Sequence, residues 1–242
     1  MGGTGGRRVP VKTLVIAPHP DDELLGCGGT LLRRRAEGGT VGWVIMTALL
    51  PAEGWEAKRI AERDAEIETV RCGLGVAPEH LYRLDYPTTR LDTVPMGNLV
   101  QRLSQVFQEF QPEEVLLPHR YDIHTDHRAT FDAAAACTKW FRYPSVRRVL
   151  TYETPSETDF SLDPAGEFRP NYFVDISDHL EAKLHLLQTY ASELAPPPFP
   201  RSLENLRALA TQRGAQAGCA AAEGFVIRIQ IEKTMQNEQK KP

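Results

Sequence analysis

The stretch LVIAPHPDDELLGCGGTLL, residues 14–32, decides the fold of this chain. It begins with a short apolar run, which is typical of a strand buried on both faces of a parallel sheet. One histidine and three acids follow, namely His19, Asp21, Asp22 and Glu23. Ionisable groups gathered beside a core repel or desolvate one another unless something compensates them. A bound cation is the simplest compensation.

Apolar runs and helical patterns alternate along the rest of the chain. This alternation predicts an α/β fold with a Rossmann-like, mainly parallel sheet and helices on both faces. We expect Gly73 to end the second helix. The predicted strands cover 13–17, 40–47, 80–86, 113–118, 146–153 and 224–231, and the predicted helices cover 23–38, 56–75, 96–110, 126–140, 178–194 and 202–217.

Composition narrows the class of protein. The 242 residues contain no repeat or linker, so we expect one domain over 1–242 with flexible ends at 1–10 and 233–242. A net charge of -4 with mixed signs favours neither nucleic acid nor a membrane surface as partner. No apolar run approaches the ~20 residues of a membrane span. The start of the chain lacks the apolar core of a signal peptide, and the four cysteines are scattered, which suits the cytoplasm.

A second cluster of ionisable residues, PHRYDIHTDHRATFDAA, covers 118–134 after the fourth predicted strand. Ligands of open parallel sheets bind beyond the carboxyl ends of the strands, and first and fourth strands are commonly neighbours. Both clusters are therefore expected to meet. His124 and His127 lie about one helical turn apart and face the same way. Two imidazoles and one carboxylate, with a position left for water, are typical of catalytic zinc.

Other interpretations compete with a metal site. The acids could be only first-turn residues that stabilise a helix N-terminus. Gly26, Gly28 and Gly29 raise the alternative of a nucleotide-binding Rossmann protein, but the G-x-G-x-x-G pattern is absent, so close helix packing explains them better. A metal-binding protein without turnover is a third class. His119 matches no motif, and a supporting or structural role is favoured for it.

PHPDDE at 18–23 together with DIHTDH at 122–127 resembles the zinc-dependent N-deacetylases of the PIG-L/LmbE-like family. Members remove acetyl groups from N-acetylglucosamine-type sugars and related conjugates. The resemblance implies an LmbE-like fold, a hydrolase that acts on an amide bond, bound Zn²⁺ and a small amino-sugar substrate. The metal could also be Fe²⁺ or another divalent ion, and the substrate could be another amide conjugate. Assembly into a homo-oligomer is a further possibility.

The same resemblance implies a role for each residue of the two motifs. The ligands of the zinc ion should be His19, Asp22 and His127. Asp21 should be the general base. His124 should assist the oxyanion or the leaving amine. Asp126 should orient a neighbouring histidine, and Arg63 should bind the substrate.

Substrate contacts are expected from the loops around the site. These loops are polar, which favours hydrogen bonds to sugar hydroxyls, whereas a pocket for an acyl chain would need a clearer apolar lining. Glu153 follows the fifth strand at the same sheet edge and is a candidate contact. Arg201, like Arg63, is a candidate for an anionic group of the substrate. The loops are TALLPAEGW at 47–55, DYPTTRLD at 85–92, YETPSE at 152–157 and PPPFPRS at 196–202.

Overall fold

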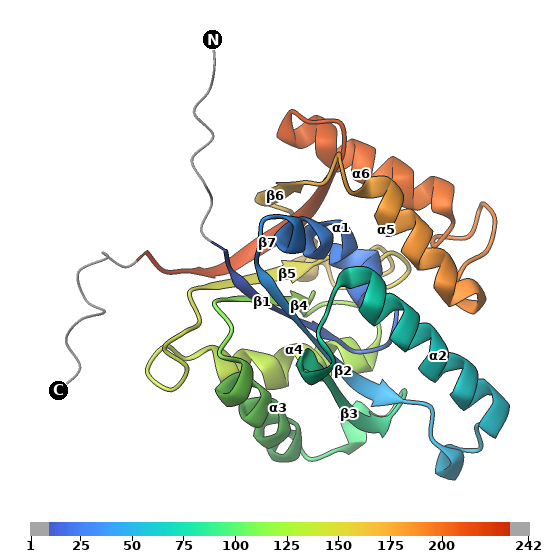
Figure 1. Ribbon diagram of the computed structural model, residues 1–242, viewed down its shortest axis with the longest axis vertical. Helices are drawn as coiled ribbons and strands as arrows, with labels where there is room; N and C mark the ends of the chain where they lie inside the picture. Colours follow the sequence, from blue (N-terminus) through green and yellow to red (C-terminus); the bar gives the residue numbers. More distant parts are fainter. Residues whose placement is uncertain (1–9, 233–242) are drawn as a thin grey trace.

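A computed structural model describes residues 10–232, so the ends expected to be flexible lie outside the described residues except for Pro10. Six helices and one sheet make up most of the described chain (Figure 1). The strands are β1 (Lys12–Ala17), β2 (Thr40–Ala48), β3 (Leu81–Pro87), β4 (Glu114–Pro118), β5 (Arg148–Tyr152), β6 (Tyr172–Asp175) and β7 (Ala222–Gln230). The helices are α1 (Asp22–Ala36), α2 (Ala57–Leu74), α3 (Met96–Phe110), α4 (Thr125–Ala135), α5 (Leu180–Leu187) and α6 (Leu203–Ala217).

The sheet has the strand order β3-β2-β1-β4-β5-β7-β6. Strands β1 to β5 pair in parallel, which confirms the predicted mainly parallel sheet. β1 and β4 are neighbours, as expected. β7 runs antiparallel between β5 and β6. The sequence patterns did not predict β6, because an edge strand of four residues leaves too short an alternation to recognise.

Helices cover both faces of the sheet (Figure 1), which the alternation of strands and helices predicted. In β1, Leu14 and Ile16 pack with α3 and α4 on one face. Val15 and Ala17 point to the other face, where α1, α2, α5 and α6 pack. Successive side chains of a strand alternate between faces, so a strand buried on both faces is apolar throughout. Among residues 10–232, none of the helices combines the length and the apolar character that spanning a membrane requires.

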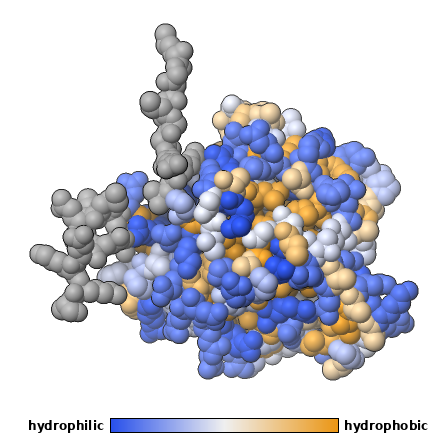
Figure 2. Space-filling view, in the orientation of Figure 1, coloured by the Kyte–Doolittle hydropathy of each residue, from blue (hydrophilic) through white to orange (hydrophobic). Residues whose placement is uncertain are grey.

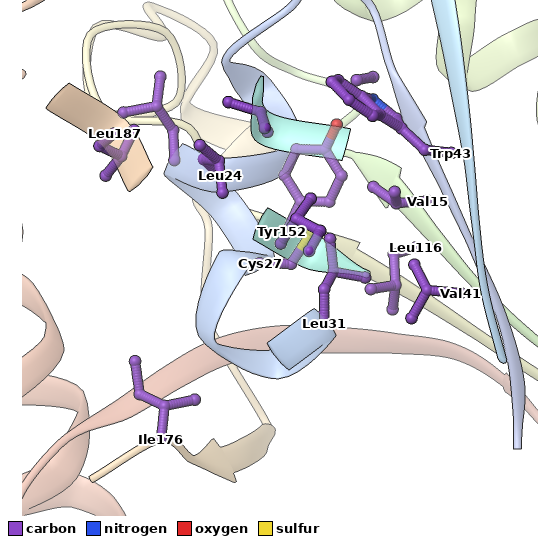
Figure 3. Packing of buried hydrophobic residues seen from close by; sticks show 14 of the residues in the cluster. Val15, Leu24, Cys27, Leu31, Val41, Trp43, Leu116, Tyr152, Ile176 and Leu187 are labelled. Atoms are coloured by element: carbon purple, nitrogen blue, oxygen red, sulfur yellow. The ribbon is translucent and has the colours of Figure 1, made fainter. Parts of the chain in front are cut away.

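The glycines of α1 allow close packing on the sheet. Figure 3 shows Cys27 of this helix beside the ring of Tyr152 from β5. A Cβ at Gly26 would lie 2.2 Å from Cδ2 of Tyr152, and one at Gly29 would lie 2.7 Å from Cδ1 of Ile176. This confirms the packing interpretation of these glycines. The helix is also broken at Cys27, where φ is -149°.

Three helix ends differ clearly from the sequence expectation. α4 ends at Ala135 instead of 140, and a 3₁₀ helix follows over Ala136–Thr138. α2 ends at Leu74, and Gly75 follows in the left-handed region with a φ of 66°. Gly73 lies inside the helix, where a Cβ would come within 2.3 Å of Cδ2 of Leu186, so its role is packing and not capping. α5 ends at Leu187, and a 3₁₀ helix continues over Gln188–Glu193.

Candidate metal centre and active site

The adjacent strands β1 and β4 bring the two ionisable clusters together at their carboxyl ends. His19, Asp22 and His127 each offer one ligand atom, and these atoms all lie within 4.8 Å of one another. Oδ2 of Asp22 lies 3.3 Å from Nδ1 of His19 and 3.4 Å from Nε2 of His127. The three residues that the sequence suggested as metal ligands therefore converge on one point.

One buried atom of Asp22 tests whether the residues fit a cation. The aspartate is 1% exposed, and its Oδ1 has no hydrogen-bond partner among the described residues. A buried carboxylate oxygen without a partner carries its full desolvation cost. A divalent ion held by one carboxylate and two imidazoles would offset that cost, and this donor set suits zinc or a similar transition metal. The residues present fit such an ion.

Each imidazole of the cluster is hydrogen-bonded to a second carboxylate. His127 Nδ1 lies 2.8 Å from Oδ2 of Asp122, and His19 Nε2 lies 3.0 Å from Oδ2 of Asp126. Carboxylates placed in this way hold a histidine in one orientation and raise its basicity toward a metal. Sequence reasoning did not single out Asp122, although it is the first residue of DIHTDH. Its role depends on the direction of the His127 ring, which no sequence spacing shows.

Asp126 differs from its expected role. Its carboxylate contacts His19, across the sheet edge, and not the ring of a neighbouring histidine. Towards His124 it offers only its backbone N–H, which donates to Nδ1 of that ring at 3.1 Å. The reason is that Asp126 lies in the first turn of α4 and points to the loop after β3, where Thr89 and Leu91 donate backbone N–H groups to its two oxygens.

A second donor set, His19, His124 and Asp126, overlaps the first. Its carboxylate is already compensated, because two backbone N–H groups at 2.7 and 2.9 Å bond its oxygens. Asp22 keeps one buried oxygen without a partner. The need for a cation is therefore greatest between His19, Asp22 and His127, and this set is the better candidate for the metal.

The electrostatics of the cluster favour positive charge. Burial alone lowers the pKa of His19, but hydrogen bonds to Asp126 and Asp22 outweigh it and raise the pKa to about 9. For His127, the charge of Asp22 and the bond to Asp122 outweigh burial and hold the pKa well above its usual value. Burial opposes ionisation of Asp22, yet the two imidazoles hold its pKa well below the ordinary range. A cation would meet a negative potential here.

Asp21, the expected base, occupies an unusual backbone conformation. Its φ is 137° and its ψ is -31°, a combination that a residue other than glycine rarely adopts. Its backbone N–H donates to Oε2 of the buried Glu23 at 3.0 Å, and Arg201 donates to its Oδ2 at 2.7 Å. Burial and the charge of the adjacent Asp22 raise the pKa of Asp21 to about 7. The strained turn separates the side chains of Asp21 and Asp22, so that only Asp21 lines the pocket described below.

His124 lies beside the cluster, and a backbone hydrogen bond fixes the tautomer of its neutral ring. Because Nδ1 accepts the N–H of Asp126, the neutral ring carries its proton on Nε2. Burial and the neighbouring imidazoles of His19 and His127 lower the pKa of His124 to about 4. The ring is therefore neutral near neutral pH and presents a donor. Its centroid lies 4.6 Å from that of His19.

A pocket of about 450 Å³ opens over the cluster. His19, Asp21 and His124 line it together with several residues of α2. Each of the four loops expected to surround the substrate contributes at least one residue. The contributing loop residues are Thr47, Ala48, Leu49, Trp55, Thr88, Thr89, Glu157 and Arg201.

Of the three expected substrate contacts, Arg201 and Arg63 line the pocket and Glu153 does not. Arg201 bonds Asp21, and Arg63 donates to the carbonyl of Pro20 at 3.0 Å. Glu153 instead forms a two-pronged ion pair with Arg213 of α6 at 2.8 and 2.6 Å. Glu153 therefore lies beside α6 and not at this pocket, contrary to the place expected for it.

Two further residues complete the surroundings of the site. Glu157, four residues after Glu153, lines the pocket and accepts a bond from Arg201 at 3.1 Å. Sequence reasoning did not single out Glu157, because only the path of the YETPSE loop decides which of its acids faces the pocket. His119 lies outside both candidate donor sets, and its Nε2 lies 2.8 Å from the carbonyl oxygen of Gly166. This contact suits the supporting role favoured for it.

Known proteins are similar to this chain in both sequence and fold. A diacetylchitobiose deacetylase of Thermococcus kodakarensis is 29% identical over 236 residues, covering 88% of this chain and 82% of the relative. The N,N'-diacetylchitobiose deacetylase of Pyrococcus horikoshii superposes with a TM-score of 0.71 at 27% identity, covering 90% of this chain and 84% of that one. A conserved protein of Thermus thermophilus reaches a TM-score of 0.73 at 28% identity, covering 93% and 98%. The family model of the GlcNAc-PI de-N-acetylases, PIG-L, matches residues 14–138, more than half of the chain and all of both motifs. The chain belongs to the PIG-L family.

Proposed function

We propose that this protein is a metal-dependent hydrolase that removes the N-acetyl group from an N-acetylglucosamine-type amino-sugar conjugate. One observation carries the proposal: His19, Asp22 and His127 converge on one point, and His19 lines a pocket together with Asp21 and His124. Family membership and the deacetylase relatives support the same reaction. Zn²⁺ is the metal we propose, because two imidazoles and one carboxylate are its usual catalytic ligands.

The proposed metal ligands are His19, Asp22 and His127. A divalent cation bound there supplies Lewis acidity, which makes water more acidic and polarises an amide carbonyl. Asp122 and Asp126 hold the two imidazoles so that one nitrogen of each stays directed at the cation. These contacts also keep both rings in one tautomer.

Asp21 is proposed to take a proton from the attacking water. The raised pKa of its carboxyl group, about 7, suits a group that accepts a proton near neutral pH. Arg201 bonds only its Oδ2, and no group of the described residues bonds Oδ1, so one oxygen stays available to a water molecule. Positioned bases of this kind contribute roughly 100- to 10,000-fold to a reaction rate.

His124 is proposed to stabilise the oxyanion that forms at the amide carbonyl. Its neutral ring holds the proton on Nε2, the nitrogen left free by the backbone bond to Nδ1. A preorganised donor aimed at developing charge is worth several kcal/mol in a site with little water. Between the two roles that the sequence left open, this geometry favours the oxyanion over protonation of the amine.

Release of free amine from a panel of N-acetyl sugars and their conjugates tests the proposal on zinc-loaded protein. We expect turnover that chelator abolishes and added zinc restores. Asp21→Asn should keep the metal but lose most turnover, whereas His127→Ala should lose metal affinity. Equal metal loss in both variants would mean that Asp21 is a ligand and not the base. Turnover that survives complete metal removal would refute the proposed function.

A further inference from the structure

The charges along the pocket balance one another. Four arginines line it, and so do four carboxylates. Arg59 donates to Ser192 at 2.8 Å and to Glu66 at 3.2 Å, and Arg83 donates to Asp64 at 2.7 Å. The other two lining arginines bond Asp21, Glu157, Glu193 and the Pro20 carbonyl, as their contacts show. Each lining arginine is therefore already held by partners of the protein, and none stands unpaired to receive an anionic group of a substrate.

Apolar side chains also line the same pocket. Leu49 and Trp55 come from the segment between β2 and α2, and Ile60 comes from the second turn of α2. We call these three residues the apolar wall. Trp55 is 41% exposed, and no ring or cation contact engages its indole among the described residues. Figure 2 shows hydrophobic residues at the surface toward the lower right, where Figure 1 places the end of β2 and the start of α2.

This wall changes the expectation that the sequence raised. The loops looked polar, which favoured a substrate with a polar body and, through Arg63 and Arg201, an anionic group. The structure instead turns Leu49 and Trp55 of the first loop into the pocket, while acids and arginines of the other loops pair with one another. Apolar surface left uncovered beside a reaction site is stabilised by an apolar ligand group.

We propose that the apolar wall binds a neutral apolar aglycone, aromatic or alkyl, carried by the amino sugar. The inference rests on the proposed function, because the sugar's acetamido group would lie near Asp21 and His124. Leu49, Trp55 and Ile60 line the same pocket as these two residues. The substrate class is thus an N-acetylglucosamine glycoside with an uncharged apolar substituent, distinguished from the free sugar and from sugar phosphates.

Rates on four substrates test this substrate class. The substrates are N-acetylglucosamine, its phenyl β-glycoside, its 1-phosphate and the disaccharide diacetylchitobiose. We expect kcat/KM for the phenyl glycoside to exceed that for the free sugar by about tenfold, since a buried phenyl ring supplies that much. Trp55→Ala should remove most of this preference. Trp140→Ala is the matched control, because Trp140 is 63% exposed and does not line the pocket, and it should leave the preference intact.

Calorimetry gives a readout that does not depend on deacetylation. The phenyl β-glycoside of glucosamine carries no acetyl group and cannot turn over. It should bind wild-type protein about tenfold more tightly than glucosamine, and Trp55→Ala should abolish that difference. If this holds while no N-acetyl sugar is hydrolysed, the apolar wall stands and the proposed function fails.

The opposite results would overturn the proposed aglycone site. One is hydrolysis of N-acetyl sugars with no dependence on Trp55 or on the aglycone. Another is a preference for the 1-phosphate, which would mean that the paired arginines leave their carboxylate partners and bind an anion. A third is a kcat/KM for the disaccharide that exceeds the value for the free sugar as much as the value for the phenyl glycoside does. The apolar wall would then bind a second sugar.

Discussion

Replacement of Asp122 by asparagine should weaken zinc binding without removing a metal ligand. Asp122 is 1% exposed, and its Oδ2 accepts the Nδ1 proton of His127 at 2.8 Å. Thr158 donates to the other oxygen at 2.6 Å. The amide keeps the size of the side chain and can keep both hydrogen bonds, since a hydroxyl also accepts. The substitution therefore removes the charge and leaves the geometry.

The expected loss follows from that charge. Carboxylates behind a metal-bound histidine are worth about 10- to 100-fold in metal affinity. Because water cannot replace a partner buried this deeply, we expect the upper end, about 100-fold or roughly 2.7 kcal/mol. Competition with a chromogenic chelator measures the zinc dissociation constant of the metal-free protein, and circular dichroism checks the fold.

A surface aspartate provides the matched control. Asp132 lies on α4, is 41% exposed and pairs with Arg120. Asp132→Asn should leave zinc affinity unchanged, because that ion pair faces solvent and does not reach His127. A folded Asp122→Asn protein with wild-type zinc affinity would refute the reasoning that Asp122 sets the basicity of His127.

Two further outcomes follow from the structure. His124→Ala should retain zinc and substrate affinity but lower kcat by about 100-fold or more, because its donor acts only on the developing oxyanion; an unchanged kcat with a raised KM would make it a substrate contact instead. Glu114→Gln should cost about 3 kcal/mol of unfolding free energy near neutral pH, since it removes the buried charge that pairs with both Arg34 and Arg148 and leaves Arg34 only the partly exposed Glu37 as an ionised partner. Burial would raise the pKa of Glu114, but the hydrogen bonds and charge of Arg34 outweigh it and hold this pKa below its usual range. The ion pair therefore stabilises the fold above the ordinary glutamate pKa, and this stability is lost as the pH falls through the pKa that Glu114 has in the folded protein. Urea unfolding of both proteins across acidic pH checks this: the difference should shrink on acidification, and a difference that grows would contradict it.

The sequence alone determined the general architecture and the position of the site within it. Buried strands and amphipathic helices leave periodic patterns, and these patterns predicted β1 to β5 and the helices that cover them. The carboxyl ends of parallel strands share one edge of a sheet, so motifs that end β1 and β4 were expected to meet. His19, Asp22 and His127 converge for this reason.

Only the tertiary structure decided which side chains of the site contact one another. Asp126 bonds His19, 107 residues away, and not its neighbour in sequence. Glu157 and not Glu153 lines the pocket, and Arg201 is paired with both Asp21 and Glu157. Such pairings depend on the register of the strands, the path of each loop and the direction of each side chain, and none of these leaves a periodic signal in the sequence.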